Sequence, residues 1–212
     1  MLDVHLPHGK LHGLKDFFLH LFTITIGLLI ALGLEGWVEY EHHRHLAHQA
    51  EAGLCAEIAQ NAHSIGQRRQ QIKDSQKQME DDLKVLAEMR AHPHAQKGKM
   101  SFGAGMSSFD DLSWKTAQNT GALAYMPYED AQAFSNIYFV QDECLRMERL
   151  HLEENTNAAS LFISHPSNWG PSPAQIDMEA DRIGRAQMQL IWLSKIVDEL
   201  DTTYQKFESA HK

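Results

Sequence analysis

The uncharged run from Phe17 to Leu34 constrains this chain more than any other part of its sequence. It contains no Asp, Glu, Lys or Arg, and His20 is its only ionisable residue. As a helix its 18 residues extend about 27 Å, close to the roughly 30 Å hydrocarbon core of a bilayer. Extension to Val38 adds one more turn, so we predict a transmembrane helix over residues 17–38.

Residues at the far end of this run fit the prediction. Trp37 and Tyr40 fall where amphipathic aromatic side chains prefer to lie, at the level of the lipid headgroups. Glu35 lies one turn inside that edge, and its side chain is long enough to reach water.

Two alternatives to a membrane span are disfavoured. A secretory signal peptide has an apolar core of about 7 to 15 residues followed by a small-residue cleavage site, and Ala31-Leu32-Gly33 fits such a site poorly. A buried helix that is apolar on all sides needs a large surrounding protein. The rest of this chain is mostly polar helix, which cannot enclose it.

Positive charges near the run predict its orientation. Lys10 and Lys15 precede it, whereas Arg44 is the only Lys or Arg in the next 20 residues. Positively charged flanks stay in the cytoplasm. We therefore expect a short cytoplasmic N-terminus over residues 1–16, a bacterial inner-membrane location, and a C-terminal body in the periplasm.

Small residues recur every four positions within the predicted span. Thr23, Gly27 and Ala31 line one helix face, where small side chains let two helix backbones approach closely in lipid. The alternative is chance, because Gly and Thr are common in such segments. Pairing through this face would give a homo-oligomer or a membrane protein complex, in addition to contact with the lipid bilayer.

A long helix is predicted to continue beyond the membrane over residues 39–90. No proline occurs between Pro7 and Pro93. An apolar row repeats every seven residues, which is typical of a helix in a bundle or weak coiled coil: Ile58, Ile65, Ile72, Met79 and Leu86. A second, patchy row lies four residues further on: Ala62, Arg69, Gln76 and Leu83.

The C-terminal half predicts one short and two long helices. Residues 91–109 are rich in Gly and read as a loop, and a short helix from Asp110 ends at Gly121. Pro127 opens a helix that runs to about Ile163, and Ser172 has the spacing of an N-cap for the last helix. The predicted buried face of the last helix is Ile176, Ile183, Met188, Ile191, Trp192, Ile196, Leu200 and Tyr204.

These elements predict an all-α fold. No segment shows the alternation of a strand. We expect one N-terminal transmembrane helix that continues into a long helix, with residues 110–212 completing an antiparallel helical bundle outside the membrane.

Histidine is the compositional outlier, with 14 residues of 212. A cluster follows the predicted span and has ligand-like helical spacing: Glu39, His42, His43, His45 and His48. Glu-x-x-His is also the repeated unit of di-iron bundles, but no second copy is well placed in the other helices. Zinc, copper or iron binding is one interpretation of this cluster, and solvated histidines and proton sensing are the two alternatives. His5, His8 and His12 repeat the spacing before the span.

Composition and motifs argue against several function classes. A net charge of −9 disfavours a nucleic-acid partner. No established catalytic motif is present, and the acid pairs Asp81-Asp82 and Asp110-Asp111 occupy apparently solvated positions. We therefore predict that the protein is not an enzyme and has no cofactor. Cys55 and Cys144 read as buried free thiols, with a disulfide as the alternative.

Aromatic side chains crowd the predicted connection between the second and third helices. The cluster contains Trp114, Tyr125, Tyr128, Phe134 and Tyr138, together with Leu123 and Met126. We expect a hydrophobic plug at one end of the bundle. A small-molecule pocket lined by the same residues is the alternative.

Two blocks of sequence are similar to a widespread uncharacterised bacterial family of short single-pass membrane proteins. They are "ITIGLLIALGLEGWVEYEHHRHL" followed by "AEIAQN", and "SWKTAQNTGALAYMPYEDAQAFSNIY". The resemblance implies an anchor followed by a long polar helix, and it implies no activity. The histidines after Tyr40 depart from the family's usual Asn and charged residues there, so no His-based function is implied.

Taken together, the sequence predicts a non-catalytic membrane anchor or accessory subunit that acts as a scaffold through helix–helix and bundle-surface contacts. The alternative is a periplasmic ligand, metal or pH sensor that signals to a partner through the anchor.

Overall fold

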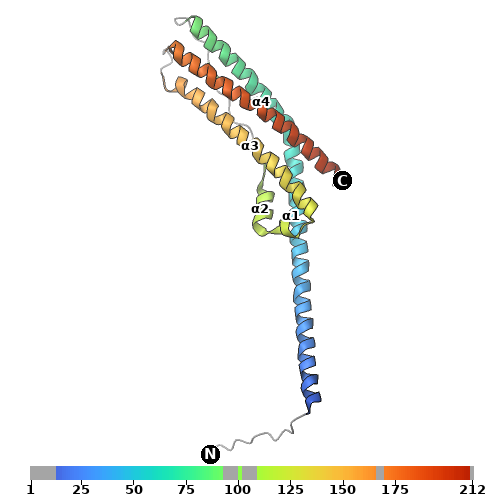
Figure 1. The fold of residues 1–212 in the computed structure, drawn as a ribbon. Coiled ribbons are helices and arrows are strands. Elements are labelled where there is room, and N and C mark those ends of the chain that lie inside the picture. The colour runs from blue at the N-terminus through green and yellow to red at the C-terminus, as the bar shows by residue number, and fades with distance from the viewer. Residues whose placement is uncertain (1–12, 93–99, 102–108, 166–169, 211–212) are drawn as a thin grey trace, which may run out of the picture. The chain divides into compact units, whose positions relative to one another are not determined.

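The computed structural model describes residues 13–92, 100–101, 109–165 and 170–210 (Figure 1). Within these ranges all regular elements are helical: α1 Leu14–Ala91, α2 Leu112–Thr120, the short 3-10 helix η1 Ala122–Tyr125, α3 Tyr128–Ile163 and α4 Pro173–Ala210. The predicted all-α fold, with three long helices and one short one, is confirmed. The chain divides into two compact units, Met1–His48 and Gln49–Lys212.

The first unit contains the N-terminal part of α1. Every residue from Phe17 to Tyr40 is solvent-exposed, including all the large apolar side chains. Thr23 and Thr25 donate hydrogen bonds to backbone carbonyls one turn earlier, which satisfies their hydroxyls without water. This segment is long and apolar enough to cross a membrane.

In the second unit, α1 buries the predicted heptad row. Ile58, Ile65, Ile72, Met79 and Leu86 are each at most 4 % exposed. Residues at this spacing share one face of a helix, and that face is in the core.

The second row of α1 residues does not form the buried companion of the first row. Ala62, Arg69, Gln76 and Leu83 are only partly buried. The buried companion row lies three residues after Ile58, Ile65, Met79 and Leu86, not four, and begins one heptad earlier: Leu54, Asn61, Arg68, Asp82 and Met89. Because three of these five residues are polar, a search for apolar periodicity passes over them.

α3 runs in the same direction as α1. Glu57 and Arg68 on α1 contact Tyr138 and Glu148 on α3, so residue numbers rise together along both helices. Of the segment between α1 and α2, we call the described residues 100–101 and 109–111 the returning segment. Ser101 contacts Asp82 of α1, whereas Asp110 contacts Asn61, so these residues follow α1 in the reverse direction.

α4 runs antiparallel to both other long helices. Arg69 on α1 pairs with Asp198 and Asp201, and Arg90, further along α1, pairs with Asp177. Between α3 and α4 the rings of Phe134 and Phe207 lie 5.2 Å apart, near the start of α3 and the end of α4.

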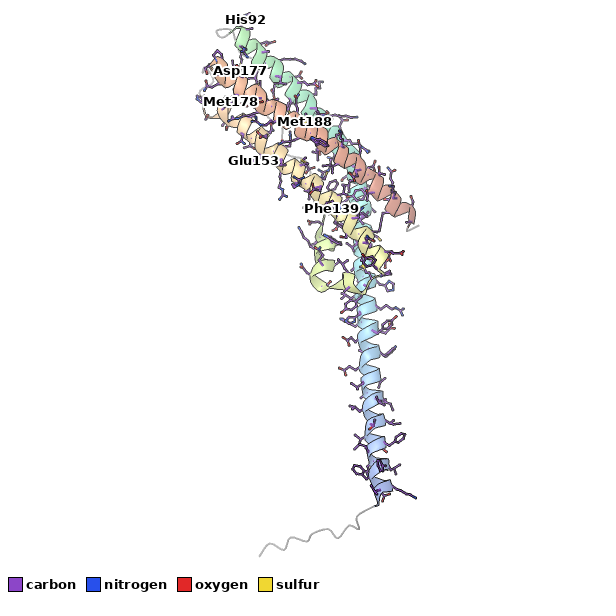
Figure 2. The ribbon with its side chains drawn as sticks, viewed as in Figure 1. His92, Phe139, Glu153, Asp177, Met178 and Met188 are labelled. Atoms are coloured by element: carbon purple, nitrogen blue, oxygen red, sulfur yellow. The ribbon has the colours of Figure 1, made fainter. Side chains whose placement is uncertain are left out.

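The buried face of α4 differs from the predicted one. It alternates steps of three and four residues: Ile176, Glu179, Ile183, Ala186, Leu190, Leu193, Val197, Leu200, Tyr204 and Phe207. Met188, Ile191 and Trp192 were predicted to lie on or near the buried face but are 45–54 % exposed. Figure 2 labels Met188 on α4. The reason is geometric, because only a three–four stripe stays against two neighbouring helices.

Two helix termini form as the sequence predicts. Gly121 ends α2 in the left-handed conformation at φ 72°, where its N–H reaches the carbonyls of Ala117 and Gln118. At α4, the Ser172 N–H donates to the Gln175 side chain and the Gln175 N–H donates back to the Ser172 hydroxyl. This is a reciprocal capping box.

Candidate functional site

The buried polar row of α1 holds the returning segment in place. The Asn61 amide donates to the Asp110 carbonyl at 2.8 Å, and the Asp110 N–H donates to the Asn61 side-chain oxygen at 2.9 Å. This reciprocal pair satisfies both backbone groups of Asp110, which would otherwise be costly to bury.

Arg68, one heptad after Asn61 on α1, also contacts the returning segment. Its side chain is fully buried, with the guanidinium 3.8 Å from the centre of the Phe109 ring. The same guanidinium forms an ion pair with Glu148 of α3. A buried charge needs such partners. Burial lowers the pKa of Arg68, partly opposed by nearby Cys144 and Tyr204.

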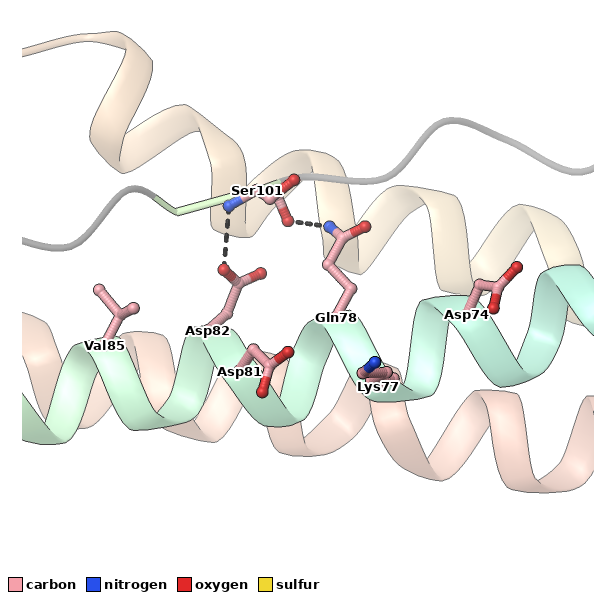
Figure 3. Close-up of a pocket in the computed structure, with 7 residues that line it drawn as sticks. All are labelled: Asp74, Lys77, Gln78, Asp81, Asp82, Val85 and Ser101. Carbon is pink, nitrogen blue, oxygen red and sulfur yellow. Dashed lines mark hydrogen bonds between the residues drawn. The ribbon is translucent and has the colours of Figure 1, made fainter.

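Asp82 continues this row at the other end of the segment (Figure 3). Its carboxylate accepts the Ser101 N–H at 2.9 Å, and the Gln78 amide donates to the Ser101 carbonyl. Burial raises the pKa of Asp82, partly offset by this hydrogen bond. The expectation that Asp82 is solvated is wrong, because the returning segment covers it.

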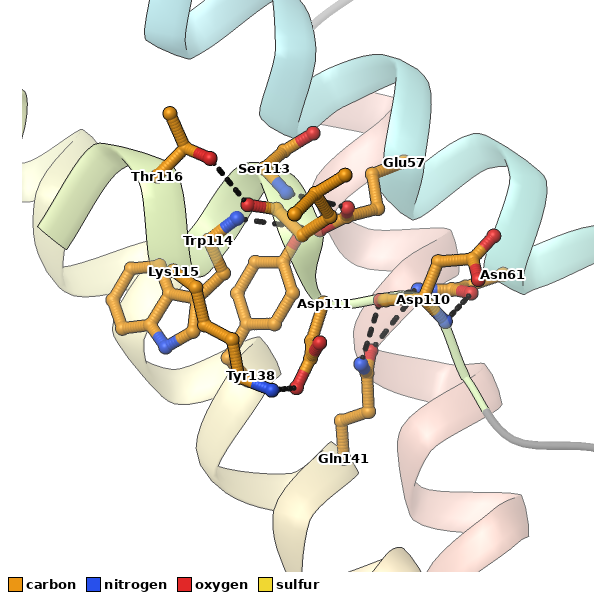
Figure 4. Close-up of polar contacts among 11 residues, drawn as sticks. Glu57, Asn61, Asp110, Asp111, Ser113, Trp114, Lys115, Thr116, Tyr138 and Gln141 are labelled. Carbon is orange, nitrogen blue, oxygen red and sulfur yellow. Dashed lines mark hydrogen bonds and ion pairs between the residues drawn. The ribbon is translucent and has the colours of Figure 1, made fainter. Parts of the chain in front are cut away.

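Glu57 connects three elements at the start of α2 (Figure 4). Its carboxylate accepts the Ser113 N–H at 2.7 Å and the Trp114 N–H at 3.4 Å. Asp111, which occupies the N-cap position, makes no side-chain capping bond. A carboxylate from α1 therefore caps the first turn of α2, where N–H groups need acceptors and negative charge is favourable.

Tyr138 of α3 completes this arrangement. Its hydroxyl donates to Glu57 at 2.5 Å, and its ring stacks on Trp114 with centroids 4.8 Å apart and planes 6° from parallel. Burial, together with the hydrogen bond to Glu57, raises the pKa of the Tyr138 hydroxyl. The phenol therefore stays protonated and acts as a donor.

Gln141 extends the network to α4. Its side-chain oxygen accepts from the Asn61 amide at 3.2 Å and from the Tyr204 hydroxyl at 2.9 Å, while its amide donates to the Asp110 carbonyl at 3.0 Å. One buried glutamine thus connects α1, α3, α4 and the returning segment.

A groove of about 320 Å³ lies beside this network, between α2 and α3. Its lining comes from one face of α2 and from residues at helical spacing on α3: Asp111, Trp114, Lys115, Gln118, Ser135, Tyr138, Phe139, Gln141, Asp142 and Leu145. Trp114 and Tyr138 belong both to the groove and to the contacts made by Glu57.

The aromatic residues singled out in the sequence fall into two sets. Phe134 and Tyr138 are buried, and Trp114 is partly buried against Tyr138. Tyr125 and Tyr128 are 46 % and 78 % exposed, so they do not belong to a buried plug. They lie on the outside of the turn around Pro127.

The predicted metal ligands all lie on α1, in or beside the exposed segment. Glu39, His42, His45 and His48 are exposed, and His43 is partly buried with its ring 6.0 Å from that of His42. Among the described residues no three His, Cys, Asp or Glu side chains are grouped to hold a metal ion. His5, His8 and His12 lie outside those residues.

The predicted pairing face is available for contact. Thr23, Gly27 and Ala31 are exposed, and a Cβ atom added at Gly27 would meet nothing within 4 Å.

The two cysteines are both free thiols. Cys144 is buried, which raises its pKa to about 11, and Cys55 is partly buried. Both thiols are therefore protonated at neutral pH.

Two buried titratable groups were not predicted. Glu179 on α4 is fully buried, which raises its pKa to about 7 despite the nearby Arg182. His151 on α3 is 9 % exposed, and burial lowers its pKa, partly opposed by its contact with the Ala186 carbonyl.

No protein-family model matches this chain, and comparison with curated proteins and with solved structures gives no match. The similarity to a family of single-pass membrane proteins therefore stays a prediction.

Proposed function

We propose that this chain is a non-catalytic, single-pass membrane anchor whose helical bundle acts as a scaffold or accessory subunit. The observation that carries this proposal is the segment from Phe17 to Tyr40, in which every residue is exposed. An apolar helix surface of this length is stable only against lipid or against other membrane helices.

The contacts made by the buried polar groups support a scaffold role. Glu57, Asn61, Arg68 and Gln141 all hold backbone groups or side chains of other elements in place. These contacts fix α2 and the returning segment to the long helices. Such groups define a rigid surface for a partner to contact.

The anchor supplies a second contact surface. Thr23, Gly27 and Ala31 are exposed on one face, which favours close pairing with another membrane helix, either from a second copy or from a different protein. The charges at Lys10 and Lys15 favour a cytoplasmic N-terminus in a bacterial inner membrane, with the bundle in the periplasm.

Crosslinking in intact membranes tests the proposal. The scaffold role predicts a stoichiometric neighbour, a second copy or another protein, that crosslinks to the full-length chain. Gly27→Ile should reduce this product, because the larger side chain keeps the helices apart. A lone monomer after crosslinking, with no neighbour, would contradict the proposal.

The anchor offers a matched control. Gly33 is also exposed with open space around it, but it lies about 120° around the helix from Gly27. Gly33→Ile adds the same bulk on a different face, so it should leave the crosslinked product unchanged.

A second candidate function is a sensor that signals to a partner through the anchor. The groove between α2 and α3 favours it, because Trp114 and Tyr138 line the groove and also contact Glu57 of α1. An occupant of the groove would therefore contact the residues that join α2 and α3 to α1.

A further inference from the structure

The groove between α2 and α3 has the size of a small-ligand site. Its volume of about 320 Å³ lies at the lower end of the range for such sites, which starts near 300 Å³. An occupant would have to be small.

The groove exposes aromatic surface. Trp114 is partly buried and stacks on the buried Tyr138, whereas Phe139, in the lining of the same groove, is 65 % exposed. Figure 2 labels Phe139 on α3. The Phe139 ring is therefore accessible to an occupant of the groove. Ring faces at such a site attract cations, and the rest of the exposed ring surface offers contacts to apolar groups.

The charge of the groove is negative. The Lys115 ammonium lies 2.6 Å from the Asp111 carboxylate, so these two charges compensate each other. Asp142 is exposed at the groove and forms no ion pair with any residue that the structure describes. Its neighbour Arg146 forms its ion pair with Glu143 and interacts with Asp142 only at longer range.

We propose that this groove binds a small organic cation, with the Phe139 ring and the edge of the Trp114–Tyr138 stack contacting its apolar surface and Asp142 compensating its charge. Aromatic rings attract ammonium groups through their π faces, and a nearby carboxylate strengthens the attraction. The chain's net charge of −9 favours the approach of cations over anions. The inference supplies the ligand class for the sensor function, but binding itself does not require signalling.

Calorimetric titration of the full-length protein in a maltoside detergent tests this assignment, with choline as the probe. The control ligand is 3,3-dimethylbutan-1-ol, which has the shape of choline but carries carbon in place of the charged nitrogen. Choline should bind at least about fivefold more tightly than this alcohol, as expected for one cation–π contact. Equal affinity for the two ligands, or no binding of choline, would overturn the proposal.

Variants locate the binding to this groove. Asp142→Asn should weaken choline binding by about fivefold, the scale of one charge contact near the surface. Glu153→Gln removes an exposed carboxylate elsewhere on α3 and should change nothing. If Asp142→Asn binds like the unmodified chain, or if Glu153→Gln weakens binding as much, the site is not this groove.

A further ligand separates a soluble cation from a lipid headgroup. Glycerophosphocholine adds a phosphate that Asp142 would repel, so it should bind more weakly than choline. Tighter binding of glycerophosphocholine would overturn the assignment to a free cation and favour a lipid. Loss of the crosslinked neighbour, in contrast, would contradict the scaffold proposal and leave choline binding unaffected.

Discussion

The hydroxyl of Tyr138 donates a 2.5 Å hydrogen bond to the Glu57 carboxylate, and the same carboxylate accepts the Ser113 and Trp114 N–H groups at the start of α2. One buried acid thereby fixes both the short helix and α3 to α1. The geometry of the α2–α3 groove depends on this contact, because Tyr138 and Trp114 also line the groove.

Tyr138→Phe should destabilise the protein although it keeps the aromatic ring. The substitution removes one hydrogen-bond donor from the buried Glu57 carboxylate, which should lower the free energy of unfolding by about 1 to 3 kcal/mol. The free energy of unfolding of the full-length chain in detergent measures this. Tyr128→Phe, at a position that is 78 % exposed, is the control and should have no effect. An unchanged stability for Tyr138→Phe would show that the contact contributes nothing.

Asn61→Leu should also destabilise, although it places an apolar residue at a buried heptad position. In a simple coiled coil such a change stabilises the core. Here it removes both hydrogen bonds to the Asp110 backbone, at a cost of about 1 to 3 kcal/mol. Ser75→Ala, in the same heptad row, should change the unfolding free energy by much less. A more stable Asn61→Leu variant would refute the role given to Asn61.

The two buried rows of α1, one apolar and one partly polar, differ in how far the sequence predicts them. Ile58, Ile65 and Ile72 are apolar at a seven-residue spacing, so their burial follows from the pattern. Asn61 and Arg68 are buried because a segment distant in sequence covers them, and no local pattern contains that information. Their position three residues after each isoleucine was the one available signal.

The ion pair of Arg68 and Glu148 should show strong non-additivity. Arg68→Met leaves Glu148 mostly buried, with 13 % of its side chain exposed and no compensating charge, at a cost of about 3 kcal/mol or more. Combining Arg68→Met with Glu148→Leu should recover much of this loss, because both charges are then absent. Chemical unfolding of the two single variants and the double variant measures the coupling. Additive effects would contradict a buried pair.

Glu179 should make stability depend on pH. In the unfolded chain its carboxyl deprotonates near its ordinary value of 4.5, whereas burial in the fold raises the pKa to about 7. The folded state therefore binds more protons between these values, and stability falls as pH rises through this window. A shift of this size corresponds to a loss of about 3 kcal/mol by pH 8.

Glu179→Gln isolates this contribution from those of other groups, including His151. Comparing unfolding free energies at about pH 5 and about pH 8, the variant should lose less stability than the unmodified chain as pH rises. Equal pH dependence in both proteins would show that Glu179 ionises normally in the fold.

The candidate site was only partly predictable, for a related reason. Trp114 and Tyr138 stand out in the sequence as large aromatics near one connection, and the structure stacks them. Glu57 looks like any acid on a polar helix, and its role depends on where α2 begins in space. The exposure of Met188 and Trp192 has the same origin, since hydropathy does not reveal which of two apolar stripes faces the neighbouring helices.

The most direct test of the account concerns the exposed segment from Phe17 to Tyr40. Cell membranes containing the full-length protein, with its amino end verified by mass spectrometry, are washed with alkaline carbonate. A spanning helix keeps the protein in the membrane pellet. The double substitution Leu28→Lys and Leu29→Lys should release it, since each central charge costs about 2.5 to 3.5 kcal/mol. Release of the unmodified protein by carbonate, or its solubility without detergent, would contradict membrane insertion.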